Sequence, residues 1–273
     1  MRLNIIGVLI LCSITSVSSA YAGFEEGKAA FVQRDYAKAF KEFKPLAERG
    51  DERSQHILGM MYDEGQGVRQ DFTEAAAWYK KAASKGNVDS AYNLGVMYAM
   101  GQGVERDDVQ SAKWFRMAAD KGHVLSQFAL GRVTTIGRGV KQDDKAANVW
   151  YRKAAQQGHF KSQLVLGKNY VEGRGIEKNP KLGFYWISQS AELGHFKAQY
   201  ELGKMYRDGV GVAADMVHAY KWYQLAATQN HEFAIVERDQ VAAGMTAEQI
   251  ARAKLLVSEW TPKKIDERHA VKQ

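Results

Sequence analysis

The sequence predicts an all-α protein, a right-handed α-solenoid of antiparallel helix hairpins with a 36-residue repeat. Two observations lead to this fold class. A shift of the chain by 36 residues aligns three sets of like residues without an insertion. Each period also contains two stretches with the three-and-four spacing of apolar residues that is typical of an amphipathic helix. Such a strict period is the signature of a solenoid, in which each unit packs only against its neighbours.

The three aligned sets divide each period into a first helix (helix A), a loop and a second helix (helix B). Helix A carries a glycine that follows a leucine: Gly59, Gly95, Gly131, Gly167 and Gly203. The loop carries a glycine that precedes valine or isoleucine: Gly67, Gly103, Gly139, Gly175 and Gly211. Helix B carries a tryptophan: Trp78, Trp114, Trp150, Trp186 and Trp222. Alanines beside each tryptophan favour the close approach of two packed helices.

Helix ends are marked by residues with known end preferences. Gly101 and Gly103 predict the left-handed turn that ends a helix A. Helix B is predicted to begin after good N-cap residues, which recur at one position of the repeat: Asp71, Asp107, Asp143, Asn179 and Asp215. Glu74 and Gln110, three residues after their caps, predict capping boxes.

The regular repeats are predicted to lie between divergent ends. We expect a divergent N-terminal capping hairpin over 23–50, the solenoid over 51–230, C-terminal capping helices over 231–260 and a mobile tail over 261–273. Thr246 and Gln249 predict a capping box for the last helix.

These motifs resemble the Sel-one-like repeat family, a branch of the tetratricopeptide superfamily. The resemblance rests on an LGxxY helix, a GxGV loop and a KWYxxAAxxG helix, and it covers about Tyr36 to Ala227. It implies a protein–protein interaction scaffold in which helix A lines the concave binding wall.

The N-terminus predicts a cleavable secretory signal peptide over residues 1–22. A short basic start precedes an apolar run, and Ala20-Tyr21-Ala22 is a typical cleavage site. No later apolar run reaches membrane length, so we expect a periplasmic or secreted protein without a transmembrane segment. Cys12 is the only cysteine and leaves with the signal, which excludes disulfides and cysteine metal sites from the mature chain.

Residues with possible site chemistry have simpler structural interpretations. His123, His159, His195 and His231 recur at the 36-residue spacing, but adjacent hairpins are too far apart to share one metal ion. We therefore expect them to be polar surface residues. The repeated tryptophans are predicted to pack in the core, and no catalytic motif or phosphate-binding loop is present. The sequence predicts no enzyme, metal or cofactor, and its mild positive charge does not indicate a nucleic-acid partner.

Four positions of helix A vary freely in chemistry between repeats and form one helical stripe. They lie six and two residues before the helix A glycine, and one and five residues after it. Ten residues on this stripe are predicted to bind a partner: Ile57, Met60, Asn93, Val96, Met100, Arg132, Lys161, Lys168, Lys197 and Lys204. The early members are mostly apolar and the later ones basic, which predicts a protein or peptide with an apolar and an acidic segment. The alternative is that the lysines only keep the helix surface soluble.

Three function classes are compatible with these sequence features. The leading hypothesis is an exported, monomeric adaptor that binds a partner on the concave helix A face. The alternative is a fixed subunit of a bacterial envelope machine, such as a flagellar motor or a polysaccharide-export complex. A peptidoglycan- or β-lactam-related enzyme is disfavoured because the chain has no SxxK motif.

Overall fold

The computed structural model describes residues 22–263, and within this range the chain consists of helices joined by short turns, with no strand. This confirms the predicted all-α solenoid of antiparallel hairpins. The predicted signal peptide, apart from Ala22, and residues 264–273 of the predicted tail lie outside the described residues.

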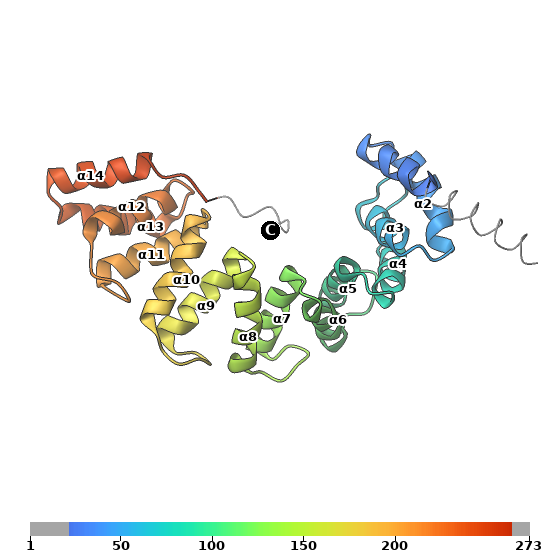
Figure 1. Ribbon diagram of the computed structural model, residues 1–273, viewed down its shortest axis with the longest axis horizontal. Helices are drawn as coiled ribbons and strands as arrows, with labels where there is room; N and C mark the ends of the chain where they lie inside the picture. Colours follow the sequence, from blue (N-terminus) through green and yellow to red (C-terminus); the bar gives the residue numbers. More distant parts are fainter. Residues whose placement is uncertain (1–21, 264–273) are drawn as a thin grey trace, which may run out of the picture. The chain divides into compact units, whose positions relative to one another are not determined.

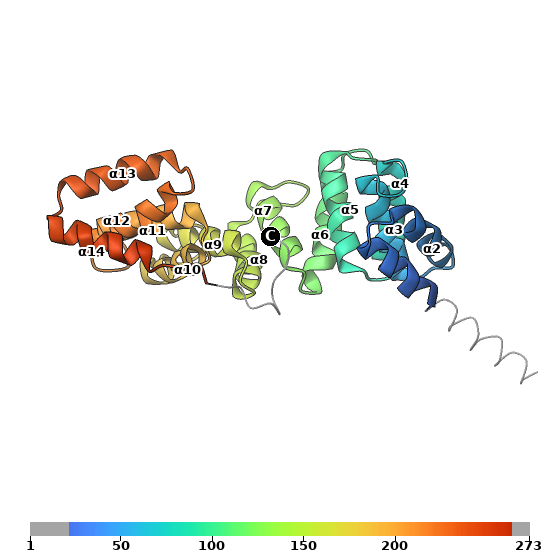
Figure 2. The ribbon, with the colours of Figure 1, turned by 90° about the horizontal axis from the view of Figure 1, so that it is seen from above.

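The chain divides into two compact units, unit 1 (Met1–His123) and unit 2 (Val124–Gln273). Each unit is a row of antiparallel helix pairs (Figures 1 and 2). After a first helix over residues 22–32, the helices A are α3 (Glu52–Glu64), α5 (Val88–Met100), α7 (Val124–Ile136), α9 (Phe160–Glu172), α11 (Phe196–Asp208) and α13 (Glu232–Ala243). The helices B are α2 (Tyr36–Glu48), α4 (Phe72–Ser84), α6 (Asp108–Asp120), α8 (Asp144–Gln156), α10 (Pro180–Glu192) and α12 (Met216–Ala227). A last helix, α14 (Ala247–Ser258), follows.

Each helix A from α3 to α11 packs closely on the next helix B because its glycine leaves room for a large side chain. A Cβ atom on Gly59 would lie 2.5 Å from Cδ1 of Tyr79, and one on Gly203 would lie 2.7 Å from Cδ1 of Tyr223. Both tyrosine rings fill this space and are fully buried. The helix A glycine is therefore a packing requirement, since any side chain there would overlap the ring.

The predicted helix ends are largely confirmed. Gly101 and Gly103 have left-handed backbones with φ of 72° and 66°, and the side chain of each predicted helix B N-cap accepts a backbone N–H bond. The capping boxes predicted at Glu74 and Gln110 are wrong. The Glu74 carboxylate instead accepts a hydrogen bond from the indole of Trp78 at 3.1 Å, and the Gln110 side chain makes no reciprocal bond to its cap. The box at Thr246 and Gln249 is confirmed.

Successive repeats within a unit are tied together at the end of helix B. In unit 1 the ammonium group of Lys85 donates to the carbonyl of Gly50, and that of Lys121 donates to the carbonyl of Gly86 at 3.0 Å. In unit 2 the amide of Gln229 donates to the carbonyl of Gly194 at 3.1 Å. These bonds satisfy carbonyl groups that the preceding helix end leaves without a partner.

The last helix departs from the repeat and closes unit 2. In α13, Arg238 and Asp239 stand 36 residues after Leu202 and Gly203, so α13 lacks the apolar, glycine-containing surface that would receive a helix B. Helix α14 packs against α12 instead. Just beyond it, the ring centroid of Trp260 lies 6.1 Å from that of Trp222, and its indole N–H donates to Glu192 at 3.4 Å.

Candidate partner-binding surface

The stripe predicted from the sequence is the face of each helix A whose side chains are exposed or half-buried. In α9, for example, Lys161 is exposed and Lys168 is half-buried, whereas the neighbouring Ser162, Gln163 and Leu166 are buried. The buried positions keep their chemistry from repeat to repeat because they face the next helices, and the stripe positions are free to vary. We call this face the helix A strip.

The residues predicted on the strip in unit 1 are mostly apolar, and most of them pack partly against the core. Ile57 packs against the core cluster that contains Phe43, and Met60 packs against the cluster that contains Leu94. Asn93 and Val96 are half-buried. Of the predicted residues only Met100, with 66% of its surface exposed, is a large exposed apolar side chain, and Ile136 of α7, which is 60% exposed, holds the same strip position in unit 2. The predicted apolar half is therefore smaller than the sequence pattern indicates.

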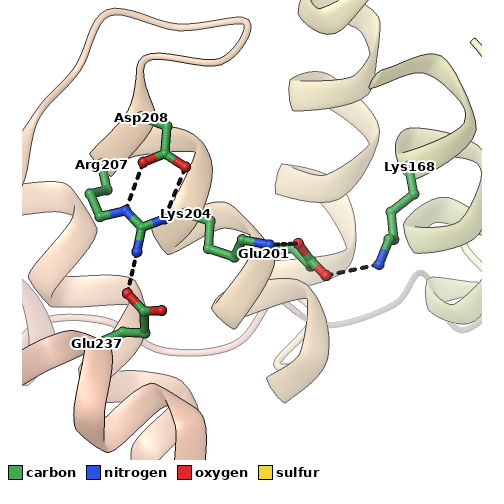
Figure 3. A network of polar contacts seen from close by, with 6 residues as sticks. All are labelled: Lys168, Glu201, Lys204, Arg207, Asp208 and Glu237. Atoms are coloured by element: carbon green, nitrogen blue, oxygen red, sulfur yellow. Dashed lines mark hydrogen bonds and ion pairs between the residues drawn. The ribbon is translucent and has the colours of Figure 1, made fainter. Parts of the chain in front are cut away.

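The five basic residues predicted on the strip all belong to unit 2, and two of them share one carboxylate. Glu201 lies between two lysines (Figure 3): its carboxylate is 2.9 Å from Nζ of Lys168 and 3.4 Å from Nζ of Lys204. Next to this trio, Arg207 pairs with Asp208 and with Glu237 of the following helix (Figure 3). The bonds from Arg207 lower the pKa of Asp208. This network connects α9, α11 and α13 along the strip, so it contributes to the fold as well as to the surface charge.

The other three basic residues keep their charge available. Arg132, Lys161 and Lys197 are exposed, and no ion pair involves them within residues 22–263. Each cationic group lies near a phenylalanine ring, 5.9 Å from the centroid of Phe128, 5.5 Å from that of Phe160 and 5.8 Å from that of Phe196, respectively. We call these three residues the cation row.

The repeated histidines are not polar surface residues, so this prediction is wrong. His159 is only 1% exposed, and its Nδ1 caps α9 by accepting from the N–H of Ser162 at 3.2 Å. Its ring lies 4.7 Å from Phe128, and the ring of His195 lies 4.6 Å from Phe160. Burial, with nearby lysines as a smaller cause, lowers the pKa of both histidines to about 4. They are neutral structural residues at physiological pH.

A signal for this role was present in the sequence. The same repeat position holds Asp51 and Asn87 in the first two helices A, and both are favoured N-cap residues. In the structure both cap their helices through side-chain oxygens. Comparing the whole column of the repeat, rather than the histidines alone, would have predicted a helix cap.

The tryptophans pack as predicted. Trp78, Trp150 and Trp222 are buried, and lysine side chains cover their outer faces, as with Lys81 at 3.6 Å from the Trp78 centroid. A cavity of about 750 Å³ lies in unit 1 between α2, α4 and the loop before α4, and Trp78 lines it. Its carboxylates Asp71 and Glu74 already serve the start of α4, so we do not select this cavity as the functional site.

No group of three or more His, Cys, Asp or Glu residues within the described part of the chain could hold a metal ion. Among the same residues, no helix is both long and apolar enough to cross a membrane.

Comparison with protein families supports the repeat that the structure displays. The model described as Sel1 repeat matches six segments: residues 19–51, 53–87, 88–123, 124–159, 161–195 and 196–231. The chain belongs to the Sel1 repeat family. The first matched segment includes the whole of the predicted N-terminal capping hairpin (23–50), so this divergent hairpin is itself a Sel1 repeat. A comparison with curated proteins finds no match.

Solved Sel1 repeat structures resemble this chain. A Sel1 repeat protein from Oxalobacter formigenes is 30% identical with a TM-score of 0.72, over 75% of this chain and 84% of that one. A protective antigen of uropathogenic Escherichia coli with the same repeat fold is 26% identical with a TM-score of 0.47, over 88% of this chain and 76% of that one. Sel1 repeats generally form non-catalytic scaffolds that mediate protein–protein interaction, so the helix A strip is the surface to consider for binding.

Proposed function

We propose that this Sel1 repeat protein is an exported adaptor that binds a partner protein on the helix A strip. One observation carries the proposal. Six residues before the helix A glycine, four of the five repeats expose the side chain, and its chemistry changes from Arg53 to Asp89 to Lys161 and Lys197, whereas the next residue is a buried serine or alanine in all five repeats. A surface that is regular in geometry and varied in chemistry is suited to reading the sequence of a partner.

Export is supported by the first 22 residues, which have the basic start, apolar run and small-residue cleavage site of a signal peptide. The mature adaptor would begin at Gly23 and act in the periplasm or outside the cell. An adaptor needs no catalytic residues, in keeping with the scaffold role of the family, and we propose that the protein is not an enzyme.

Affinity purification of the tagged mature protein from crosslinked envelope extract tests the adaptor role. We expect a specific protein to be recovered, and we expect its recovery without crosslinker to fall as salt is raised, because the cationic part of the strip contributes to binding. A salt-resistant, stoichiometric complex would indicate a fixed subunit of an envelope machine instead. Recovery of no specific protein from envelope extract or from culture medium would refute the proposal.

A further inference from the structure

The positive charge of the protein is concentrated in one unit. Residues 124–263 contain 19 Lys and Arg against 13 Asp and Glu, whereas residues 22–123 contain 15 against 16. The excess of unit 2 is +6 and unit 1 has a net charge of −1, with histidines neutral. An acidic partner is therefore attracted to unit 2.

Some cations of unit 2 on the helix A strip already form ion pairs within the chain, and the others are available to bind an anionic ligand. Lys168 and Lys204 share the Glu201 carboxylate, and Arg207 is held by Asp208 and Glu237 (Figure 3). A ligand that used these groups would have to displace carboxylates already in place. They are poor candidates for binding a new anion.

The cation row has no carboxylate partners among the described residues, and a comparison of equivalent repeat positions explains why. Lys168 pairs with Glu201 of the next helix A, but the position equivalent to Glu201 one repeat earlier holds Val165. Arg132, one repeat before Lys168, therefore has no carboxylate to meet. Lys161 and Lys197 lie six residues before their helix A glycines, near the buried His159 and the half-buried His195. Neutral histidines and phenylalanine rings surround these cations without cancelling their charge.

We propose that the cation row, Arg132, Lys161 and Lys197, binds side-chain carboxylates of an extended acidic segment of the partner protein. This inference rests on the proposed adaptor function and names the chemistry of its ligand. Neighbouring packed helices are about 8–10 Å apart, and three residues of extended chain span about 10 Å. Lys161 and Lys197 hold the same position in successive helices A, so carboxylates about three residues apart match the step between them, whereas Arg132 holds a position seven residues later in its own helix, about 10 Å further along the helix axis.

An acidic peptide fits this surface better than a nucleic acid does. A nucleic-acid strand carries one phosphate about every 3.4 Å, so it would place charges between the cations of the row. On the same strip it would meet the carboxylates of Glu172, Glu201 and Asp208, two of which are well exposed. A peptide with spaced carboxylates can match the separation of Lys161 and Lys197, and it can place neutral residues beside the carboxylates of the strip.

The test measures binding of a fluorescent 12-residue peptide with glutamate at every third position to the full mature protein. The triple variant Arg132→Gln, Lys161→Gln, Lys197→Gln is compared with a matched control, Lys145→Gln, Lys178→Gln, Lys181→Gln. The control removes the same charge from exposed residues of the same unit, at the start of helices B and in a loop. Circular dichroism establishes that both variants are folded.

We expect the triple variant to bind the peptide about tenfold more weakly than wild type, as three solvent-exposed ion pairs are lost, and the control to change it less than about twofold. Equal losses in both variants, no loss in either, or no binding by wild type at low salt would overturn the proposal. So would tighter binding of a single-stranded oligonucleotide of the same length. If the peptide fails but the envelope partner is still recovered, the adaptor function stands and only the acidic-segment inference is wrong.

Discussion

In three hairpins, residues 16 positions apart lie opposite each other where helix A packs on helix B. Where helix B offers a tyrosine hydroxyl, the facing position of helix A is polar: Tyr79 donates to Asp63 at 3.4 Å, and Tyr151 and Thr135 share a bond of 3.1 Å. Where helix B has Ile187, the position 16 residues earlier is Val171, in the same apolar cluster. For Tyr79 and Tyr151 the polar partner avoids the cost of leaving a buried hydroxyl unbonded, whereas the buried hydroxyl of Tyr223, opposite Arg207, makes no hydrogen bond within residues 22–263.

Replacing the helix A glycine should destabilise the fold through overlap with the helix B ring. We expect Gly203→Ala to lower the free energy of unfolding by about 2 kcal/mol, because the new Cβ would meet the buried ring of Tyr223. Gly244→Ala is the control: its φ is −96°, and the nearest atom to a Cβ there is 3.8 Å away. Urea denaturation measures both. Equal effects of the two substitutions would contradict the packing account.

The buried histidine caps should make stability depend on pH. The pKa of His159 is about 4 in the folded chain, below the ordinary value of 6.5, so the unfolded chain binds more protons between these values. The free energy of unfolding should therefore fall as pH falls from about 6.5 to about 4, by up to about 3 kcal/mol from His159.

The variant His159→Asn keeps an N-cap, as Asn87 does in the second hairpin, but removes the titration. We expect its unfolding free energy to depend less on pH than that of wild type over the same range. Identical pH profiles for the two proteins would show that His159 does not carry this dependence.

Most helices could be predicted from the sequence because the residues that mark their ends recur in every repeat. The N-caps at Asp71 and Asp107 and the glycines that end helix A are local signals, and the structure confirms them. The failed capping box at Glu74 was not predictable locally, since the indole of Trp78 competes for the carboxylate. The packing of α14 on α12 depends on tertiary contacts, although Asp239 at the position of a helix A glycine indicated a break in the pattern.

The contact of Trp260 with the preceding repeat should hold α14 in place. We expect Trp260→Ala to speed amide hydrogen exchange in α14 at least about fivefold with little change in α11, because the mutation removes the packing on Trp222 and the bond to Glu192. Leu255→Ala, at a side chain that is 55% exposed in the same helix, serves as control. Similar exchange in both variants would mean that α14 is held by other contacts.

At the scale of the whole molecule, the position of the candidate surface was predictable and its charge state was not. The 36-residue period is sufficient to place Lys161 and Lys168 on one exposed face of α9. That Lys168 is paired while Lys161 is free depends on Glu201, which the next repeat brings within 2.9 Å. Likewise, Ile57 and Met60 vary like surface residues but pack partly on the core.

The export hypothesis predicts the N-terminal residue of the mature chain. If the signal peptide is cleaved after Ala22, the protein isolated from its native compartment begins at Gly23. Intact-mass measurement and N-terminal sequencing should give a chain that lacks the first 22 residues. A chain that retains them in the periplasmic or secreted fraction would contradict the predicted cleavage.

The most direct test of the adaptor account is site-specific photo-crosslinking in cells. A photoreactive amino acid replaces Met100 or Lys197 on the helix A strip, or, as matched controls in the same two units, Val109 of α6 or Leu182 of α10, which are exposed residues of helices B. The account predicts that the two strip positions crosslink to the same partner protein and that the helix B positions do not. Adducts only from the helix B positions, or none from the strip, would contradict the claim that the helix A strip binds the partner.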